Sequence, residues 1–269
     1  QLLIGSNWNT LRLDLDQEQA QALAADGRSL DAYTSDMAWF GNALWLSGTD
    51  GLWRVEDNKA VNVMADTAGE RRVSRLLVDG DTLWIGTWKG LKRLVLQSDG
   101  QVEISQVDDA ILNQKFINAL HKDSSGRLWV GTYGGGLLYK EAKTAMSNKA
   151  WSHIGDKQGL PGNKVTGILS DEAGNLWVGA EDGLARIDAR SLIVSAIRPE
   201  AGASAAPYET AVRSANGDLL FGGSNGITVV RPDSWKPVRN QAPLVFTHVR
   251  DGSGNAMPIQ EQPGIHPVL

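Results

Sequence analysis

The stretch that decides the fold reads Leu-Trp-Val-Gly-Ala-Glu-Asp-Gly-Leu-Ala-Arg-Ile and occupies residues 176–187. Related copies of this stretch stand at residues 2–13, 44–55, 83–94, 128–139 and 219–227. The copy at 219–227 has Leu in place of Trp, and the copy at 2–13 is degenerate. The positions equivalent to Trp are 3, 45, 84, 129, 177 and 220, at spacings of 42, 39, 45, 48 and 43 residues. These intervals indicate one structural unit that is used six times.

Each unit has the sequence pattern of β-structure. In the best copy, the apolar segment 165–170 is followed at 171–175 by Asp-Glu-Ala-Gly-Asn, whose Asp, Gly and Asn favour a hairpin turn. Leu-Trp-Val-Gly then forms a second strand, residues 183–188 a third, and the more variable residues 192–197 a fourth. Four strands in each repeat of about 43 residues are typical of a propeller blade.

We therefore predict an all-β fold, a β-propeller built of four-stranded antiparallel blades. Six blade units are visible in the sequence, and a seven-bladed ring is the alternative that this count leaves open. The first and second strands are almost entirely apolar, which is typical of sheets that neighbours cover on both faces. The repeated Trp side chains are then structural residues between blades, namely Trp45, Trp84, Trp129 and Trp177. Only residues 16–25, rich in Gln and Ala, favour a short helix or a loop.

The composition excludes several classes of function. The 269 residues include 26 Lys and Arg against 31 Asp and Glu, and this net charge of −5 argues against nucleic acid as a partner. The chain has no Cys, which excludes disulfide frameworks, thiolate metal sites and cysteine nucleophiles. It contains no run of 18 apolar residues and does not open with a signal-peptide pattern. We expect no cofactor and no metal.

The unit resembles the two-component regulator propeller repeat. The resemblance rests on Val165-Thr-Gly-Ile, Asp171, the stretch 174–179, Gly183-Leu184 and Arg186-Ile-Asp, with the preceding Gly-Leu-Pro-Gly-Asn at 159–163. It extends over roughly residues 1–235. It implies a periplasmic sensor region of an inner-membrane signalling protein, whose histidine kinase, response-regulator or diguanylate cyclase modules lie outside this chain. It further implies a homodimer in the full-length receptor, and membrane contact only through segments absent from this chain.

The sequence places the propeller in residues 1–240 and leaves two interpretations for residues 241–269. Residues 243–249, Pro-Leu-Val-Phe-Thr-His-Val, resemble the start of the small β-sandwich domain that follows such propellers. They also fit the first strand of the repeat, which the copy at 2–13 lacks, so that they could close the ring before a tail.

A ligand site is expected where two sets of loops gather at one face of a propeller. One set follows the second strands, and the other precedes the first strands. Trp8, Trp88 and Tyr133 are large aromatic residues on polar turns, where a ring is suited to stacking on a flat polar ligand. Neighbouring Arg and Lys favour a polar, anionic ligand, which we expect to be a small molecule or a glycan. The candidate ligand-binding residues are Trp8, Arg72, Trp88, Lys89, Lys115, Tyr133, Lys164, Glu181, Asp182, Tyr208 and Asn225.

No catalytic residue is predicted. The histidines at 121, 153, 248 and 266 share no turn position and have no metal-ligand spacing, and no common catalytic motif occurs. The leading hypothesis is therefore a non-catalytic, ligand-binding extracytoplasmic sensor domain. Two alternatives are a propeller lyase resembling virginiamycin B lyase and a protein-interaction scaffold.

Overall fold

The computed structural model describes residues 2–5, 10–14, 16–17, 19–22, 24–25, 28–29, 33–57, 59–64, 72–142, 150–199, 202–203, 206–236, 249–250 and 256–257. The chain divides into two compact units, Gln1–Trp235 and Lys236–Leu269. In the second unit, β25 (Val249–Arg250) and β26 (Ala256–Met257) form an antiparallel pair. Most of the segment 241–269 lies outside the described residues, so both interpretations of it stay predictions.

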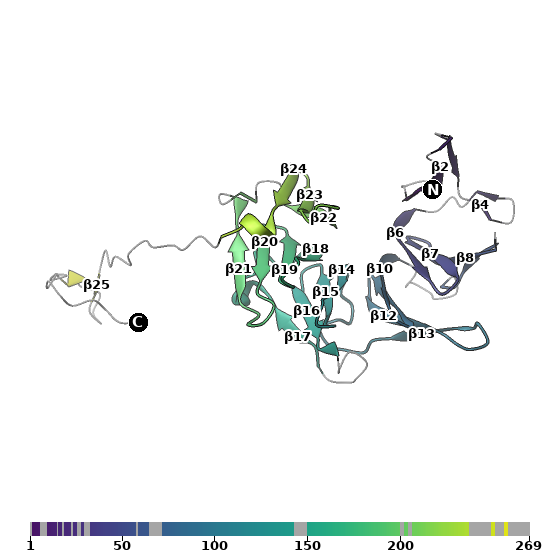
Figure 1. Ribbon diagram of the computed structural model, residues 1–269. Coiled ribbons are helices and arrows are strands. Elements are labelled where there is room, and N and C mark those ends of the chain that lie inside the picture. Colours follow the sequence, from purple (N-terminus) through teal and green to yellow (C-terminus); the bar gives the residue numbers. More distant parts are fainter. Residues whose placement is uncertain are drawn as a thin grey trace. The chain divides into compact units, whose positions relative to one another are not determined.

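Six antiparallel sheets follow one another along the first unit, and we number them blades 1 to 6 in chain order (Figure 1). Blade 1 holds β1 (Leu2–Gly5), β2 (Thr10–Asp14) and β3 (Gln19–Ala22). Blade 2 holds β6 (Thr34–Phe40), β7 (Ala43–Gly48), β8 (Gly51–Glu56) and β9 (Lys59–Asn62). Blade 3 holds β10 (Val73–Asp79), β11 (Thr82–Thr87), β12 (Gly90–Leu96) and β13 (Val102–Gln106).

Blade 4 holds β14 (Ile117–Lys122), β15 (Leu128–Thr132), β16 (Leu137–Lys140) and β17 (Ser152–Ile154). Blade 5 holds β18 (Val165–Ser170), β19 (Leu176–Ala180), β20 (Gly183–Ile187) and β21 (Val194–Ile197). Blade 6 holds β22 (Tyr208–Arg213), β23 (Leu219–Gly223) and β24 (Gly226–Val230). A short pair, β4 (Ala24–Ala25) with β5 (Arg28–Ser29), and two 3-10 turns, Asp156–Gln158 and Pro232–Ser234, complete the described elements. The predicted all-β propeller fold is confirmed.

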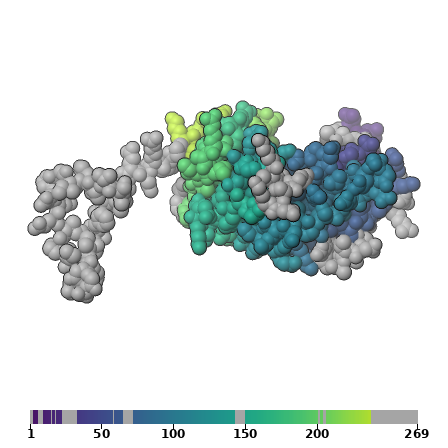
Figure 2. Space-filling view, turned by 90° about the horizontal axis from the view of Figure 1, so that it is seen from below, coloured from purple at the N-terminus to yellow at the C-terminus, as the bar shows by residue number. Residues whose placement is uncertain are grey.

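Neighbouring blades contact each other through their first strands, so that β6, β10, β14, β18 and β22 follow one another. The space-filling view shows the same succession by colour, from blue through teal to green (Figure 2). Each of these strands has a bulge at its second residue. At three of the bulges the side-chain hydroxyl donates a hydrogen bond to the carbonyl of the first strand residue in the next blade. These bonds run from Ser35 to Val73 (3.3 Å), from Ser74 to Ile117 (2.5 Å) and from Thr166 to Tyr208 (2.8 Å).

The glycine of Leu-Trp-Val-Gly is explained by this close approach between blades. A Cβ atom on Gly131 would stand 2.6 Å from Cγ1 of Val165, the first strand residue of the next blade. Gly86 has the same relation to Ile117, at 2.8 Å. A side chain at either position would therefore separate two blades.

The repeated Trp residues lie between blades and are fully buried, at Trp45, Trp84, Trp129 and Trp177. Trp177, for example, packs with Tyr208, Leu219 and Phe221 of blade 6. Its indole N–H donates to Oδ2 of Asp171 at 3.0 Å. In this blade, an Asp in the first hairpin turn therefore accepts the proton of the buried Trp, whereas Trp45 of blade 2 donates to the Phe40 carbonyl at 3.0 Å.

Blade 4 has the same pair, in which the indole of Trp129 donates to Asp123 at 2.8 Å. Burial by itself would raise the pKa of Asp123, but hydrogen bonds from Ser125, Trp129 and Arg127 outweigh it and leave the pKa lowered. Asp123 is therefore held ionised as an acceptor inside the turn.

The prediction of a helix or loop at residues 16–25 is wrong. Gln19–Ala22 form β3, which pairs with β2 in the register Leu11 to Ala22 and Leu13 to Ala20. The edge of β2 offers these residues backbone partners, and tertiary pairing outweighs the helical preference of Gln and Ala. Among the described residues, no helix has the length and apolar character needed to cross a membrane.

Candidate functional site

A repeated backbone hydrogen bond joins the two loop sets at one end of each blade. The residue after the second strand donates its N–H to the carbonyl of the residue just before the first strand. This bond links Trp88 to Arg72 at 3.2 Å and Tyr133 to Phe116 at 2.8 Å. The same bond links Glu181 to Lys164 at 3.2 Å, and Ser224 to Pro207 at 3.3 Å. The predicted loops of blades 3 to 6 therefore lie at corresponding ends of their blades.

Three aromatic rings form a continuous row on this face, which we call the aromatic row: Trp88, Phe116 and Tyr133. The ring centroids of Trp88 and Phe116 are 4.8 Å apart, with the planes inclined by 31°. Phe116 and Tyr133 are stacked, with centroids 6.3 Å apart and an angle of 14°. The row joins blade 3 to blade 4, and the isolated bridge between Tyr133 and Lys164 joins it to blade 5.

A cation lies against each end of the aromatic row. The guanidinium carbon of Arg72 is 4.3 Å from the ring centroid of Trp88. The ammonium nitrogen of Lys164 is 5.1 Å from the ring centroid of Tyr133. Both distances are within the range of cation–π interactions, and this attraction keeps the two charges close to the ring faces. Trp88 and Tyr133 are nevertheless 46% and 55% exposed, so both rings remain accessible from solvent.

Other predicted residues lie around the aromatic row without joining it. Lys115 lies beside the turn of blade 4, because a Cβ atom on Gly135 would stand 3.4 Å from its Cε. Glu181 and Asp182 lie against Gly162, in the connection that leads into blade 5. The remaining two residues are exposed, Lys89 beside Trp88 in the turn and Asn225 on blade 6.

The side chain of Asn225 donates to the carbonyl of Ala206 at 3.0 Å, which ties the blade 6 turn to its own connection. Together these side chains place cations around blades 3 and 4 and carboxylates on blade 5.

Tyr208 was expected on the exposed face, but it is fully buried against Phe221, and its hydroxyl bonds to that of Thr228 at 2.8 Å. The reason is register, because Tyr208 is the first residue of β22 and takes the buried position that Val165 has in blade 5. Trp8 lies outside the described residues.

Phe116 is the site residue that sequence reasoning missed. The sequence places Phe116 in the connection before the first strand of blade 4. Its neighbour Lys115 is among the predicted site residues because of its charge, whereas Phe116 is not. The signal was available in the strand register, because Arg72, Phe116 and Lys164 each stand directly before the first strand of a blade. Position in the repeat, rather than residue type, identifies the middle ring of the row.

The histidines that the structure describes have structural partners. The ring of His121 lies 2.6 Å from the Ser170 hydroxyl in the next blade, and burial lowers its pKa although Asp123 acts in the opposite direction. Nε2 of His153 lies 3.0 Å from the carbonyl oxygen of Gly135. Within the described ranges, no three His, Asp or Glu side chains form a group that could hold a metal ion.

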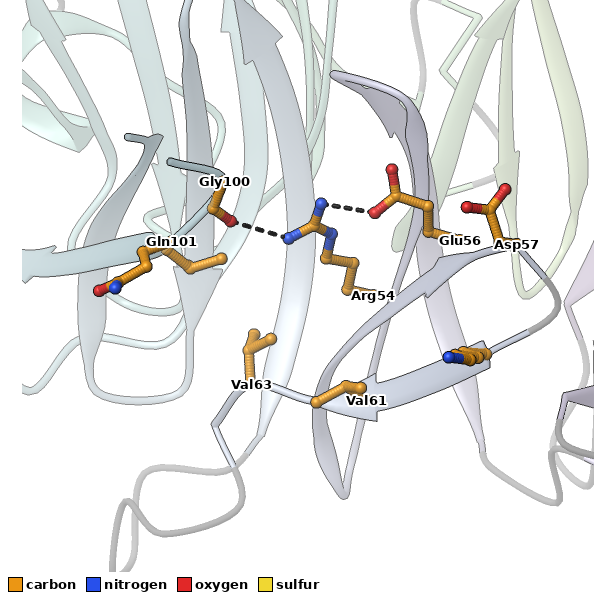
Figure 3. A pocket seen from close by; sticks show the side chains of 9 residues that line it. Arg54, Glu56, Asp57, Val61, Val63, Gly100 and Gln101 are labelled. Carbon is orange, nitrogen blue, oxygen red and sulfur yellow. Dashed lines mark hydrogen bonds and ion pairs between the residues drawn. The ribbon is translucent and has the colours of Figure 1, made fainter. Parts of the chain in front are cut away.

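A cavity of about 550 Å³ lies at the rim between blades 2 and 3, away from the aromatic row. Its polar wall is Arg54, whose guanidinium donates to Glu56 at 2.5 Å and to the Gly100 carbonyl at 3.1 Å (Figure 3). Val61 and Val63 lie on its apolar side. Because Arg54 is already neutralised by Glu56, this cavity offers a weaker case for ligand recognition than the aromatic row.

Residues 111–134 and 159–182 match the family described as two component regulator propeller. The chain contains two-component regulator propeller repeats. The matched segments cover the first two strands of blades 4 and 5, which carry the Asp–Trp pairs and Tyr133. No protein of curated function matches the chain significantly.

Solved structures share the fold of these regulator propeller repeats. The extracellular domain of a hybrid two-component system from B. thetaiotaomicron is 22% identical, with a TM-score of 0.68, over 87% of this chain and 31% of that one. A second such domain is 18% identical, with a TM-score of 0.67, over 96% and 37% of the two chains. Virginiamycin B lyase from Staphylococcus aureus is 13% identical, with a TM-score of 0.59, over 85% and 76%. The chain thus spans about a third of the length of these two extracellular domains.

Proposed function

We propose that this chain is a non-catalytic, ligand-binding sensor domain in the extracytoplasmic, periplasmic part of a signal-transduction protein. The regulator propeller repeats support this proposal, as does the shared fold with extracellular domains of hybrid two-component systems. The single observation that carries the ligand site is the aromatic row with a cation at each end.

The ligand that this arrangement favours is polar and anionic, either a small molecule or a glycan. Because Arg72 lies over the Trp88 ring and Lys164 over the Tyr133 ring, a ligand at the row meets two positive charges together with the exposed parts of the rings. Ring edges carry partial positive charge, so both parts of the site attract an anion. A guanidinium that lies flat on a ring still has its N–H donors in its own plane, and it binds a carboxylate or sulfate without leaving Trp88.

The test begins with the purified chain on a glycan array that includes acidic sugars, together with a panel of small organic anions. Trp88→Ala is expected to weaken the bound compound by about 1–3 kcal/mol in calorimetric titration, as for an interface aromatic. Trp39→Ala is the matched control, because Trp39 is also an exposed Trp but lies beside the first hairpin turn of blade 2. Equal affinity of the Trp88 and Trp39 variants would remove the aromatic row from the site.

Salt dependence separates anion recognition from simple stacking. Exposed charges are screened within about 8 Å at physiological ionic strength. Affinity should therefore fall as salt rises, and Arg72→Gln should reduce that dependence more than Trp88→Ala does. Conversion of a bound compound to a product would favour the lyase alternative, and binding of proteins alone would favour the scaffold.

A further inference from the structure

The cavity between blades 2 and 3 lies beside a position that recurs in every four-stranded blade. In each of these blades, one residue of the third strand pairs directly with the buried Trp of the second strand. We call this the third-strand position, and its residues in blades 2 to 5 are Arg54, Arg93, Tyr139 and Arg186. The groups that contact this position at one junction therefore show what the same place can accept at another.

At the junction of blades 5 and 6, an aromatic ring lies against the third-strand position. The guanidinium carbon of Arg186 is 5.0 Å from the ring centroid of Trp235. The rings of Trp235 and Trp177 are nearly perpendicular, at 87°, and their centroids are 5.4 Å apart. Trp235 therefore contacts both the third-strand Arg and the buried Trp with which this Arg pairs.

At the junction of blades 4 and 5, the third-strand residue itself supplies the ring. The ring centroid of Tyr139 lies 4.7 Å from that of Trp129, with the planes inclined by 31°. Leu192 and Val194 of blade 5 are partly buried against the same cluster. Two junctions of the chain therefore hold a ring at this place, although different residues supply it.

Between blades 2 and 3, the corresponding place borders the cavity of about 550 Å³, a volume within the range of small-molecule sites. Arg54 and Val61 are cross-strand partners, and both line the cavity. Val63 of blade 2 and Val102 of blade 3 add apolar surface. None of the described residues that line the cavity is aromatic. This junction therefore has the Arg and the apolar walls, but its lining supplies no ring.

The guanidinium of Arg54 gives this cavity a flat and fixed surface. Its two terminal nitrogens donate to Glu56 and to the Gly100 carbonyl, and these bonds hold its plane in position (Figure 3). The charged lining residues are two of each sign, Arg54 and Lys59 against Glu56 and Asp57. Unlike the aromatic row, the cavity is therefore suited to an uncharged group rather than to an anion.

We propose that this cavity binds one uncharged, planar aromatic ring of about the size of an indole, carried by a small molecule. The ring lies against the guanidinium of Arg54, as Trp235 lies against Arg186 at the junction of blades 5 and 6. A guanidinium attracts the face of a ring, and contact with the valine side chains removes apolar surface from water. The proposal does not rest on the ligand site at the aromatic row.

Titration of the purified chain with indole, followed by saturation-transfer NMR of the ligand, tests this site. A ring of this size is expected to bind with a dissociation constant of about 1 mM or lower. Val61→Trp places a ring of the chain's own beside Arg54 and should weaken the binding of indole at least tenfold. Val212→Trp is the matched control, because Val212 on β22 of blade 6 and Val61 on β9 are both 59% exposed. The control variant should bind indole as the wild type does.

The contribution of the Arg54 guanidinium is measured separately. Arg54→Lys retains a positive charge beside Glu56 but loses the planar face, so it should weaken the binding of indole several-fold, and unchanged binding would contradict stacking on Arg54. Because indole is uncharged, its affinity should not fall as salt rises, whereas that of an anion at the aromatic row should. Circular dichroism and thermal melting establish that each variant is folded.

Absence of indole binding to the wild-type chain would overturn the proposal, as would equal weakening by Val61→Trp and Val212→Trp. Trp88→Ala should leave the binding of indole unchanged, and a loss of binding in this variant would place the ring on the aromatic row instead. A capped Gly-Gly-Trp-Gly-Gly peptide that binds at least tenfold more tightly than indole would overturn the small-molecule assignment, because the cavity would then recognise a Trp side chain in a polypeptide.

Discussion

Blades 5 and 6 have the same strand register but differ at two positions that belong together. In blade 5, Asp171 accepts the indole proton of the buried Trp177. In blade 6 the corresponding residues are Ser214 and Leu220, and the hydroxyl of Ser214 bonds to the Asp218 carbonyl at 2.9 Å. An unpaired buried indole N–H or carboxylate is costly, so the two residues are replaced together. The comparison teaches that a buried Trp at this position comes with an acceptor for its indole proton, which is Asp171 in blade 5 and the Phe40 carbonyl in blade 2.

The largest effect on stability is expected at the Trp-equivalent position, where blade 5 has Trp177 and blade 6 has Leu220. Trp177→Ala is expected to lower the free energy of unfolding by about 3–5 kcal/mol, because the cavity lies between two blades that cannot fully collapse. Leu220→Ala, at the half-exposed equivalent in blade 6, should cost about 1 kcal/mol. Urea unfolding of both variants measures the difference. Equal losses would mean that the two faces are buried alike.

The next largest loss of stability is expected when Asp171, the hydrogen-bond acceptor in the first hairpin turn of blade 5, is replaced. Asp171→Ala leaves the Trp177 indole and the Asn175 amide without their acceptor, and should cost about 1–3 kcal/mol. Ser214→Ala in blade 6 is the control and should cost less than about 1 kcal/mol, because it removes one hydrogen bond near the surface. Larger losses in blade 6 than in blade 5 would contradict the coupling of Asp with Trp.

Blade 4 differs from blades 5 and 6 because the stability that it contributes should depend on pH. The position of Leu169 and Val212 carries His121 in blade 4, and burial lowers the pKa of His121. The unfolded chain binds a proton near the ordinary His value of about 6.5, but the folded chain resists it. The stability that His121 contributes is therefore present above about pH 6.5 and is lost as pH falls through its lowered pKa.

The stability of His121→Gln should change less than that of the wild type over this window, in melts recorded between about pH 7 and 5. The lowered pKa of Asp123 acts in the same direction at lower pH, since its contribution is present above the ordinary Asp value of about 3.9. Parallel pH profiles of wild type and variant would show that His121 does not titrate in this way.

The smallest effect concerns the ion pair between blades 5 and 6. Arg213 donates to Glu172 at 2.9 Å, but both side chains are well exposed. Exposed ion pairs contribute at most about 1 kcal/mol and are screened by salt. Glu172→Gln should therefore change the free energy of unfolding by less than about 0.5 kcal/mol, and a larger change would place this pair among the contacts that hold blade 6 in position.

The fold was predictable because each repeat contains its own strand and turn signals. Trp177 and Gly179 mark the second strand, and Asp171 marks the turn before it. Residues 16–25 were misjudged because their pairing with β2 is a tertiary effect that local composition does not contain.

The candidate site was predictable only in part. Arg72, Trp88, Tyr133 and Lys164 were recognised as loop residues, and the structure brings them together with Phe116. Phe116 was missed because charge, rather than position in the repeat, selected Lys115 from the same connection. Tyr208 was misjudged because a one-residue shift in register decides which side chain enters the core. The strand bulges that set this register leave no clear mark in the sequence.

The hydroxyl bonds at those bulges bear on how such a chain grows during evolution. Ser35, Ser74 and Thr166 each bond to a backbone carbonyl of the next blade, on residues as different as Val73, Ile117 and Tyr208. Because the acceptor is main chain, the joint does not depend on which side chain the next copy carries. A tandem duplication or deletion of one whole repeat therefore restores the same joint on both sides. Copies remain free to diverge at their loops, where new specificities arise, without a matching change in their neighbours.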